Sequence, residues 1–212
     1  MTEHPSIKHP TRLTTGDFTA ATDPISLFFA WFEEAGRQET SDPNAMALAT
    51  VDADGLPDVR VVLMKEFTAE GVVFFTNYGS RKSDDMTANP VVALNFHWKS
   101  LKRQVRVRGE IVKIPEAESD AYFATRHRQS QIGAWASQQS RPLESRAAFE
   151  AATEAVAKKY EGQDIPRPPH WGGFRVTPLV IEFWQDRPFR LHDRIEFRRN
   201  LEGKWTRTRL FP

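Results

Sequence analysis

Apolar residues recur at spacings of three and four near the start of the sequence. The residues that follow this period are Leu27, Phe28, Trp31, Phe32 and Ala35. Such spacing places them on one face of a helix. Asp23 followed by Pro24 is typical of a helix start, and the pattern ends near Gly36. The polar residues 1–22 show little periodicity, so we expect a flexible arm there, followed by an amphipathic helix.

The middle of the chain alternates between short apolar runs and residues that favour turns. These runs predict five closely spaced strands, at 44–51, 59–65, 71–76, 91–98 and 104–114. After a loop at 166–173, a sixth strand is predicted at 179–184, and a hairpin at 196–209 turns at Glu202 and Gly203. Closely spaced strands of this kind favour an antiparallel β-barrel.

Three further helices are predicted between the strands. Ser80 is expected to cap a short helix that stops before Pro90, and two longer helices are predicted at 115–125 and 144–160. The alanines of 144–160 are expected to mark its buried side. Residues 129–140, between the two longer helices, are rich in amides and hydroxyls. The sequence therefore predicts a single mainly β domain (α+β) over residues 23–212, with helices packed outside the barrel.

Composition narrows the classes of function. The chain has 212 residues, of which 29 are Lys or Arg and 28 are Asp or Glu, so its net charge of +1 carries no strong signature of nucleic-acid binding. It has no cysteine, and its six histidines include no pair four residues apart, which argues against a metal site. No apolar run is long enough to span a membrane and no secretory signal is present, so we expect a cytoplasmic protein.

Cations at the ends of predicted strands are candidate anion ligands, because no glycine-rich phosphate loop occurs. Arg60 and Lys65 bracket a wholly apolar run, as in a strand buried on both faces. Alternation places the two cations on opposite faces, so a shared ligand requires a bulge or a position at the strand ends. Arg81 and Lys82 fall in the first turn of a predicted helix. Cations at this end of a helix are repelled by the helix macrodipole, so their position is unfavourable unless an anion lies beside them.

Two further groups carry polar side chains. Tyr122 and Arg126 stand four apart on a predicted helix, with Ser130 shortly after, and they form either a phosphate cup or an ordinary surface pair. Gln104 lies in an alternating strand, where its amide faces either a polar ring edge or solvent.

The densest group follows Trp184, where Arg190, His192 and Arg194 occupy alternate positions. In an extended chain these three side chains point the same way and Leu191 points the other way. Two flanking cations favour a neutral imidazole at His192. The segment therefore predicts an anion site that contains a group able to exchange a proton.

Several segments together resemble the pyridoxine 5′-phosphate oxidase family. They are Ile181 to Gln185 with Arg190 to Arg194, Arg60 to Lys65, Asn77 with Ser80 to Lys82, Arg103 to Val105, Ser130 to Trp135, and Trp171 to Arg175. The resemblance runs in order from about Pro43 to Pro212. It implies a split β-barrel of the FMN-binding type, and a homodimer with two FMN sites at the subunit interface.

The resemblance also implies a role for particular residues. Those implied to hold FMN are Arg60, Val61, Val62, Leu63, Met64, Lys65, Phe75, Thr76, Arg81, Lys82, Gln104, Gln139, Ser140, Trp184 and Arg194. Those implied to bind substrate are Lys65, Tyr122, Arg126, Ser130, Arg190, Leu191 and His192, with Arg190 and His192 acting in catalysis. The implied reaction oxidises pyridoxamine or pyridoxine 5′-phosphate with O2, giving pyridoxal 5′-phosphate, H2O2 and, from the amine, ammonia.

Three alternatives remain open from the sequence. A split-barrel flavin reductase needs the FMN residues without the substrate set, and a non-catalytic pyridoxal phosphate carrier keeps every binding residue but lacks turnover. The third alternative is a protein that binds single-stranded nucleic acid. Residues 96–108, where Trp98 lies among five cations, would form its binding surface.

Overall fold

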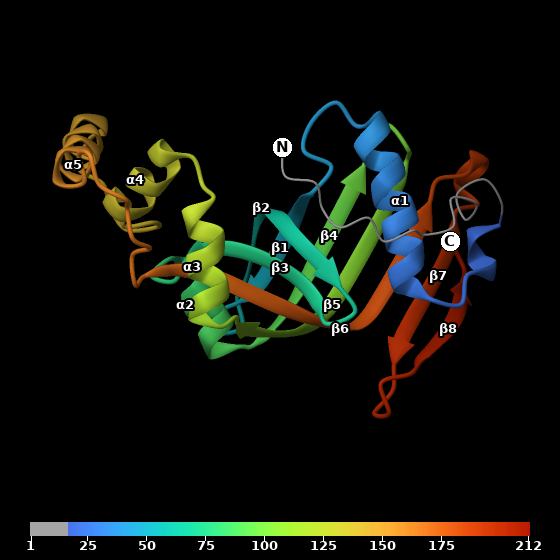
Figure 1. The fold of residues 1–212 in the computed structure, drawn as a ribbon. Coiled ribbons are helices and arrows are strands. Elements are labelled where there is room, and N and C mark those ends of the chain that lie inside the picture. The colour runs from blue at the N-terminus through green and yellow to red at the C-terminus, as the bar shows by residue number, and fades with distance from the viewer. Residues whose placement is uncertain (1–16) are drawn as a thin grey trace.

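A closed six-stranded antiparallel barrel forms the body of the computed structural model, which describes residues 17–212 (Figure 1). Its strands are β1 (Ala45–Val51), β2 (Pro57–Thr68), β3 (Gly71–Asn77), β4 (Val91–Trp98), β5 (Arg103–Lys113) and β6 (Trp171–Gln185). β6 pairs with both β5 and β3, and this double pairing closes the barrel. β7 (Asp193–Arg199) and β8 (Trp205–Leu210) extend the sheet beyond β6. The predicted mainly β fold, an antiparallel split barrel with flanking helices, is confirmed.

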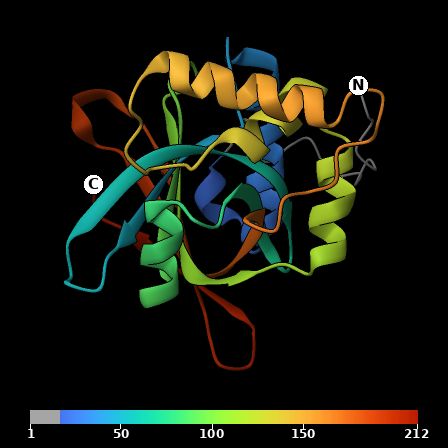
Figure 2. The same ribbon diagram turned by 90° about the vertical axis from the view of Figure 1, so that its left-hand side faces the viewer.

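The helices lie at two places around the barrel. α1 (Pro24–Gln38) packs along one side, with the carboxylate of Asp23 accepting hydrogen bonds from the amides of Ile25 and Ser26 as predicted. α2 (Arg81–Ala88), α3 (Glu116–Ala124), α4 (Arg128–Ala136) and α5 (Arg146–Lys159) gather at one end, which faces the viewer in Figure 2. None of these described helices has the length and apolar character needed to cross a membrane.

The main core lies between α1 and the inner face of the barrel. Phe28 is fully buried, and its ring centroid lies 4.3 Å from that of Phe67 and 5.1 Å from that of Phe96. Trp31 packs edge-on against Phe183 of β6 at 5.3 Å. Burial of each such side chain contributes about 2 kcal/mol. This core fixes the barrel strands that carry the site.

The predicted arm, residues 1–22, is only partly described, because residues 1–16 lie outside the described part of the chain. The rest includes a 3-10 turn at Phe18–Ala20. Phe18 is buried, and its ring centroid lies 5.0 Å from that of Trp31. The packed part of the chain therefore includes Phe18, which precedes the predicted domain boundary at residue 23.

β6 begins much earlier than the strand predicted at 179–184. The segment expected to be a loop contains Gly172 and Gly173, which pair with β3 and close the barrel. A Cβ atom on Gly172 would lie 2.2 Å from the Tyr78 hydroxyl, and one on Gly173 would lie 2.4 Å from Ile114 Cδ1. Glycine is rare in strand interiors except where another group approaches closely. The glycines that concealed this strand are therefore the residues that its packing requires.

The helical end differs from the prediction at three points. Residues 129–140, for which no helix or strand was predicted, contain most of α4, whose first turn is capped by the His127 side chain. No residue of α5 is buried, contrary to the expected alanine face, because α5 packs mainly on α4; the buried residue is Tyr160, just after its end. Ser80 makes no side-chain cap, and its hydroxyl instead donates to the carbonyl of Asn77 at 2.7 Å.

Candidate active site

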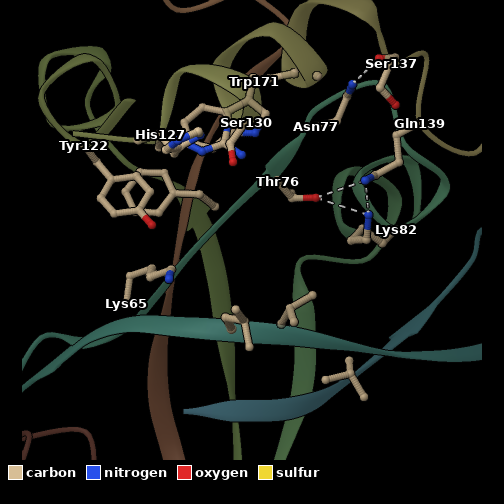
Figure 3. A pocket seen from close by; sticks show the side chains of 17 residues that line it. Lys65, Thr76, Asn77, Lys82, Tyr122, His127, Ser130, Ser137, Gln139 and Trp171 are labelled. Carbon is tan, nitrogen blue, oxygen red and sulfur yellow. Dashed lines mark hydrogen bonds between the residues drawn. The ribbon is translucent and has the colours of Figure 1, made fainter. Parts of the chain in front are cut away.

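A cavity of about 760 Å³ opens between β2, β3 and the helices at the end of the barrel (Figure 3). The predicted site residues that line it are Val61, Val62, Leu63, Lys65, Phe75, Thr76, Lys82, Tyr122, Arg126, Ser130 and Gln139. Sequence reasoning missed its other lining residues, which are Asn77, His127, Gly133, Ala134, Ser137 and Trp171. Most of these belong to α4 or flank it, and α4 was not predicted.

Lys65 reaches the cavity because β2 contains a bulge. The register between β2 and β3 shifts between Met64 and Glu66, so Lys65 is the extra residue. A bulge redirects the side chain that it carries. The Lys65 ammonium lies 5.9 Å from the ring centroid of Tyr122. The bulge that the sequence argument required for Lys65 is therefore present, whereas Met64 is buried in the core.

Arg60, at the other end of the apolar run, does not line this cavity. Its guanidinium donates to Thr50 Oγ1 at 2.6 Å and to the Asp58 carboxylate at 2.5 Å, with the buried Asp85 at 3.7 Å. The expectation that the run is buried on both faces is wrong for a single chain, because Val61 is 69% exposed and Leu63 is 39% exposed.

Three parallel aromatic rings form one wall of the cavity. Phe75 stacks on Tyr122 with ring centroids 3.9 Å apart, and on Trp171 with centroids 5.4 Å apart. The planes differ by 15° or less. These rings give the cavity a flat apolar wall. The Tyr122 hydroxyl and the cations of Lys65 and Arg126 lie near this wall.

Arg126 differs from the other cations of the cavity because one of its buried nitrogens has no hydrogen-bond partner within residues 17–212. It follows the end of α3 rather than continuing the predicted helix, and its guanidinium lies 4.6 Å from the ring centroid of Trp171. Burial lowers the pKa of the Arg126 guanidinium, and its buried Nη1 has no hydrogen-bond partner among residues 17–212. An unsatisfied buried cation is costly unless a ligand completes its bonds. Ser130, in the first turn of α4, lines the same cavity.

Lys82 provides a second cationic point, in the first turn of α2. Its ammonium donates to Gln139 Oε1 at 2.6 Å and to Thr76 Oγ1 at 3.1 Å (Figure 3). It also donates to Ser80 Oγ at 3.0 Å. All three acceptors are uncharged. Burial, and then the charge of Arg60, lower the pKa of Lys82 to about 8. The neighbouring Arg81 and the predicted Ser140 are exposed and do not line the cavity.

Three other predicted residues form a row at the far end of β6. Gln104 on β5 is the register partner of Trp184 on β6, which in turn is the partner of Arg194 on β7. β6 begins at Trp171, which lies in the cavity wall, and Trp184 lies near the other end of the same strand. The intervening residues of this strand span on the order of 40 Å along its path. One chain therefore does not bring this row into the cavity.

The segment that connects β6 to β7 is not extended, contrary to the prediction. Phe189 and Arg190 have φ angles of 58° and 64°, and a 3-10 turn occupies Pro188–Arg190. The expectation that Arg190, His192 and Arg194 alternate along one strand is therefore wrong, because β7 begins only at Asp193.

His192 has an acidic neighbour instead of two flanking cations. Its Nδ1 lies 3.1 Å from the Asp186 carboxylate and accepts a hydrogen bond from the Arg187 amide at 3.2 Å. Its ring lies 4.6 Å from that of Trp184, so it belongs to the same end of the sheet as the row. Arg190 and Leu191 are exposed beside it.

Glu182 neutralises the cations on this part of the sheet. It is buried and accepts hydrogen bonds from Arg194, at 2.9 Å, and from Arg106. Burial alone would raise the pKa of Glu182, but the bonds from Arg194 and Arg106 outweigh it and hold the pKa below its ordinary value. A second cavity of about 540 Å³ lies over these residues and the small side chains of Ala47 and Ala93.

The basic segment 96–108 does not have the surface of a nucleic-acid platform. Trp98 is only 2% exposed, so its ring is not available to stack on a base. Arg103 pairs with Glu34 at 2.7 Å, and Arg106 pairs with Glu182. The cations of this segment are therefore largely compensated within the fold.

Comparisons with known proteins agree along the whole chain. Residues 32–160 match the family model described as pyridoxamine 5′-phosphate oxidase, and residues 171–212 match the pyridoxine 5′-phosphate oxidase C-terminal dimerisation region. Proteins named pyridoxine/pyridoxamine 5′-phosphate oxidase from Bradyrhizobium diazoefficiens and Nitrobacter winogradskyi are each 62% identical over 213 residues, covering 100% of both chains.

Solved structures share the fold. PhzG from Burkholderia lata, solved with tetrahydrophenazine-1-carboxylic acid, has a TM-score of 0.84 and 31% identity, covering 91% of this chain and 94% of that one. A related FMN-binding protein from Nostoc punctiforme has a TM-score of 0.73 at 17% identity, covering 91% of this chain and 100% of that one, and its likeness concerns the fold alone. Together with the family model and the full-length relatives, these matches show that the chain belongs to the pyridoxamine 5′-phosphate oxidase family.

Proposed function

We propose that this protein is an FMN-dependent oxidase of pyridoxamine 5′-phosphate and pyridoxine 5′-phosphate. O2 is the oxidant, pyridoxal 5′-phosphate and H2O2 are the products, and the amine also releases ammonia. The observation that carries the proposal is the buried, unpartnered Nη1 of Arg126 in a cavity that also contains Lys65 and Ser130. The full-length relatives that bear this name support it.

The substrate phosphate is assigned to the cation-lined part of the cavity. Arg126 offers unused donors on Nη1, Lys65 adds a positive charge, and Ser130 adds a hydroxyl. Arginine and lysine bind phosphate through charge-assisted hydrogen bonds. The Tyr122 hydroxyl completes the set, and the aromatic stack supplies a flat surface next to it.

The residues at Lys82 fit the phosphate of FMN. Lys82 is a buried ammonium whose three protein acceptors are all neutral, so an anion would satisfy it better than the protein does. Thr76 and Gln139 hold it in place, and the adjoining wall is lined by Val61, Val62, Leu63 and Lys65 of β2. The chemistry that FMN supplies when bound is acceptance of a hydride from substrate C4′ and transfer of electrons to O2.

A second copy of the chain would bring the distant row to the cavity. Val59 and Val61 on β2 are 63% and 69% exposed, which leaves an apolar surface uncovered in one chain. The match of residues 171–212 to a dimerisation region supports a homodimer with FMN at its interface. In this arrangement the partner's copies of the row residues Gln104, Trp184 and Arg194 complete the flavin site.

Arg190 and His192 would act from the same partner copy on the substrate. Arg190 orients the pyridine ring, and His192, whose Nδ1 accepts a hydrogen bond from the Arg187 amide, offers the substrate the proton on Nε2. Leu191 supplies an exposed apolar contact beside them. Neither Arg190 nor His192 is needed as a nucleophile.

The proposal is tested with the purified protein. It should be yellow, release FMN on denaturation, and lose its yellow colour when pyridoxine 5′-phosphate is added without oxygen. Admission of oxygen should restore the colour and yield H2O2. A colourless protein that does not take up added FMN would contradict the proposal.

The roles of Arg190 and His192 are tested by single substitutions. Arg190→Ala and His192→Ala should each lower turnover on the order of a hundredfold while FMN retention stays near that of the wild type. Arg198→Ala, exposed on β7, is the matched control and should leave both unchanged. Equal losses of turnover and FMN retention would reassign Arg190 and His192 to cofactor binding.

A further inference from the structure

His127 lines the cavity beside Arg126 and Ser130, although no role was predicted for it. It precedes α4 and acts as its N-cap residue. The Ser130 amide donates to the His127 carbonyl at 2.8 Å, so the backbone of His127 is held by the helix that it caps. The imidazole therefore stands at a defined place in the cavity wall.

The cap determines where the ring of His127 carries its proton. Nδ1 accepts a hydrogen bond from the Gln129 amide at 3.3 Å. A nitrogen that accepts a hydrogen bond carries no proton, so in the tautomer that keeps this cap the proton is on Nε2. Nε2 has no hydrogen-bond partner within residues 17–212. His127 is exposed and lines the cavity, so its ring presents to the cavity an N–H donor that no described residue uses.

The neighbours of His127 indicate what this donor would bind. Nη1 of Arg126 is buried and has no hydrogen-bond partner within residues 17–212. Ser130 is exposed and turns its hydroxyl-bearing side chain to the same cavity. The first turn of α4 contains no acidic residue. Unused donors at a helix N-terminus favour an anion. A phosphate group has enough acceptor oxygens to bond several donors at once.

We propose that His127 is a further substrate-binding residue, which donates a hydrogen bond from Nε2 to the substrate phosphate beside Arg126 and Ser130. The proposal rests on the proposed oxidase function and adds a residue to its phosphate site. His127 then has two roles: its Nδ1 caps the N-terminus of α4, and its Nε2 donates a hydrogen bond to the substrate phosphate. Because one task fixes the tautomer needed for the other, the donor is oriented before substrate arrives.

Two substitutions separate these tasks. His127→Ser keeps a side-chain oxygen that caps a helix well but removes the distal N–H, whereas His127→Ala removes both. Gln129→Ala, an exposed neighbour that does not line the cavity, is the matched control. The KM and kcat for pyridoxine 5′-phosphate, FMN retention and the melting temperature are measured for all four proteins.

We expect His127→Ser and His127→Ala to raise KM about tenfold, the factor typical of one hydrogen bond to a charged group. The value of kcat and FMN retention should stay within about twofold of the wild type, since a ground-state contact acts on KM. Only His127→Ala should lower the melting temperature. Gln129→Ala should match the wild type.

The inference is overturned if His127→Ser has the KM of the wild type, because His127 would then serve only as a cap. Calorimetric titration with pyridoxal 5′-phosphate gives a second readout that does not depend on turnover. A wild-type protein that binds pyridoxal 5′-phosphate without oxidising pyridoxine 5′-phosphate would refute the oxidase function alone. Equal affinity of the wild type and His127→Ser for pyridoxal 5′-phosphate would refute the role of His127 alone.

Discussion

The cations in the cavity and those at the far end of β6 have opposite surroundings. In the cavity, Lys82 donates only to neutral oxygens and Arg126 has a buried nitrogen without a partner. At the far end, Arg194 bonds the buried Glu182 and His192 faces Asp186. The first group is energetically incomplete without an anion, whereas the second is already compensated within the protein.

This difference indicates separate roles for the cavity cations and the far-end cations in ligand binding. A buried cation without a counter-charge lowers stability, so its presence points to a ligand that supplies the missing charge. Cations that are held by acids have a fixed position and little need of an anion. One chain therefore contains the cations of an anion site at the cavity. In the proposed homodimer, the compensated second group would contact a ligand bound in the partner's cavity.

Mixing two inactive variants gives the largest expected effect. Arg126→Ala removes a cavity residue and His192→Ala removes a residue of the far end, so each homodimer has two defective sites. After subunit exchange, a heterodimer has one intact site, and an equal mixture should recover about a quarter of wild-type activity. Activity is assayed as O2 consumption at low substrate concentration. A mixture as inactive as its components would place both groups in the same chain's site.

Arg126→Met tests the unsatisfied cation directly. We expect KM for pyridoxine 5′-phosphate to rise about a hundredfold, because a desolvated charged contact is lost. The free energy of unfolding should not fall, since the substitution removes an unpaired buried nitrogen. Urea unfolding measures this. Arg167→Met is the control, because Arg167 bonds Asp120 and the Trp171 carbonyl, and its loss should destabilise the fold.

Glu182→Ala tests the compensated group. Arg194 would lose its carboxylate partner inside the sheet, so we expect a loss of about 2 kcal/mol in the free energy of unfolding. Urea denaturation measures it. Glu196→Ala is the matched control on β7, and it should cost under about 1 kcal/mol because its arginine partners Arg108 and Arg198 are more than half exposed. Equal losses would show that Glu182 has no special role.

The pH dependence of FMN binding tests Lys82 and has the smallest expected effect. Burial lowers the pKa of Lys82 to about 8, so its charge is present at pH 7 and largely lost by pH 9. The FMN phosphate is already dianionic in this range. FMN affinity, followed by flavin fluorescence, should therefore fall about tenfold from pH 7 to pH 9. Lys82→Met should bind FMN weakly with a flat profile, and a wild-type profile equally flat would contradict the role of Lys82.

The regular elements of the fold follow closely from the sequence where the local pattern is strong. The helix from Pro24 and the strand at Val91–Trp98 are formed as predicted, because capping, apolar period and turn residues all agree there. The start of β6 and the whole of α4 escaped prediction. At β6, two glycines with low strand propensity are held by pairing with β3, and at α4 an uncommon histidine cap replaces the usual polar residues.

Some residues of the candidate site were also identified from the sequence, and others only from the structure. The sequence and its resemblance to a family identified Lys65, Tyr122, Arg126 and Ser130 together, and the structure places all four around one cavity. The segment from Arg190 was expected to be extended, and the structure shows a turn there. His127 had no sequence signal, because a lone histidine reveals neither its cap nor its cavity.

The sequence by itself determined the kind of fold, the family and most of the residue types that meet the ligands, because these depend on local pattern and on motifs in order. Only the tertiary structure decided which cations are paired and which are not. That depends on distant contacts, such as the bond of Arg194 to Glu182 and the isolation of Arg126 Nη1. The charge balance of each group arises from residues that the folded barrel brings together or keeps apart.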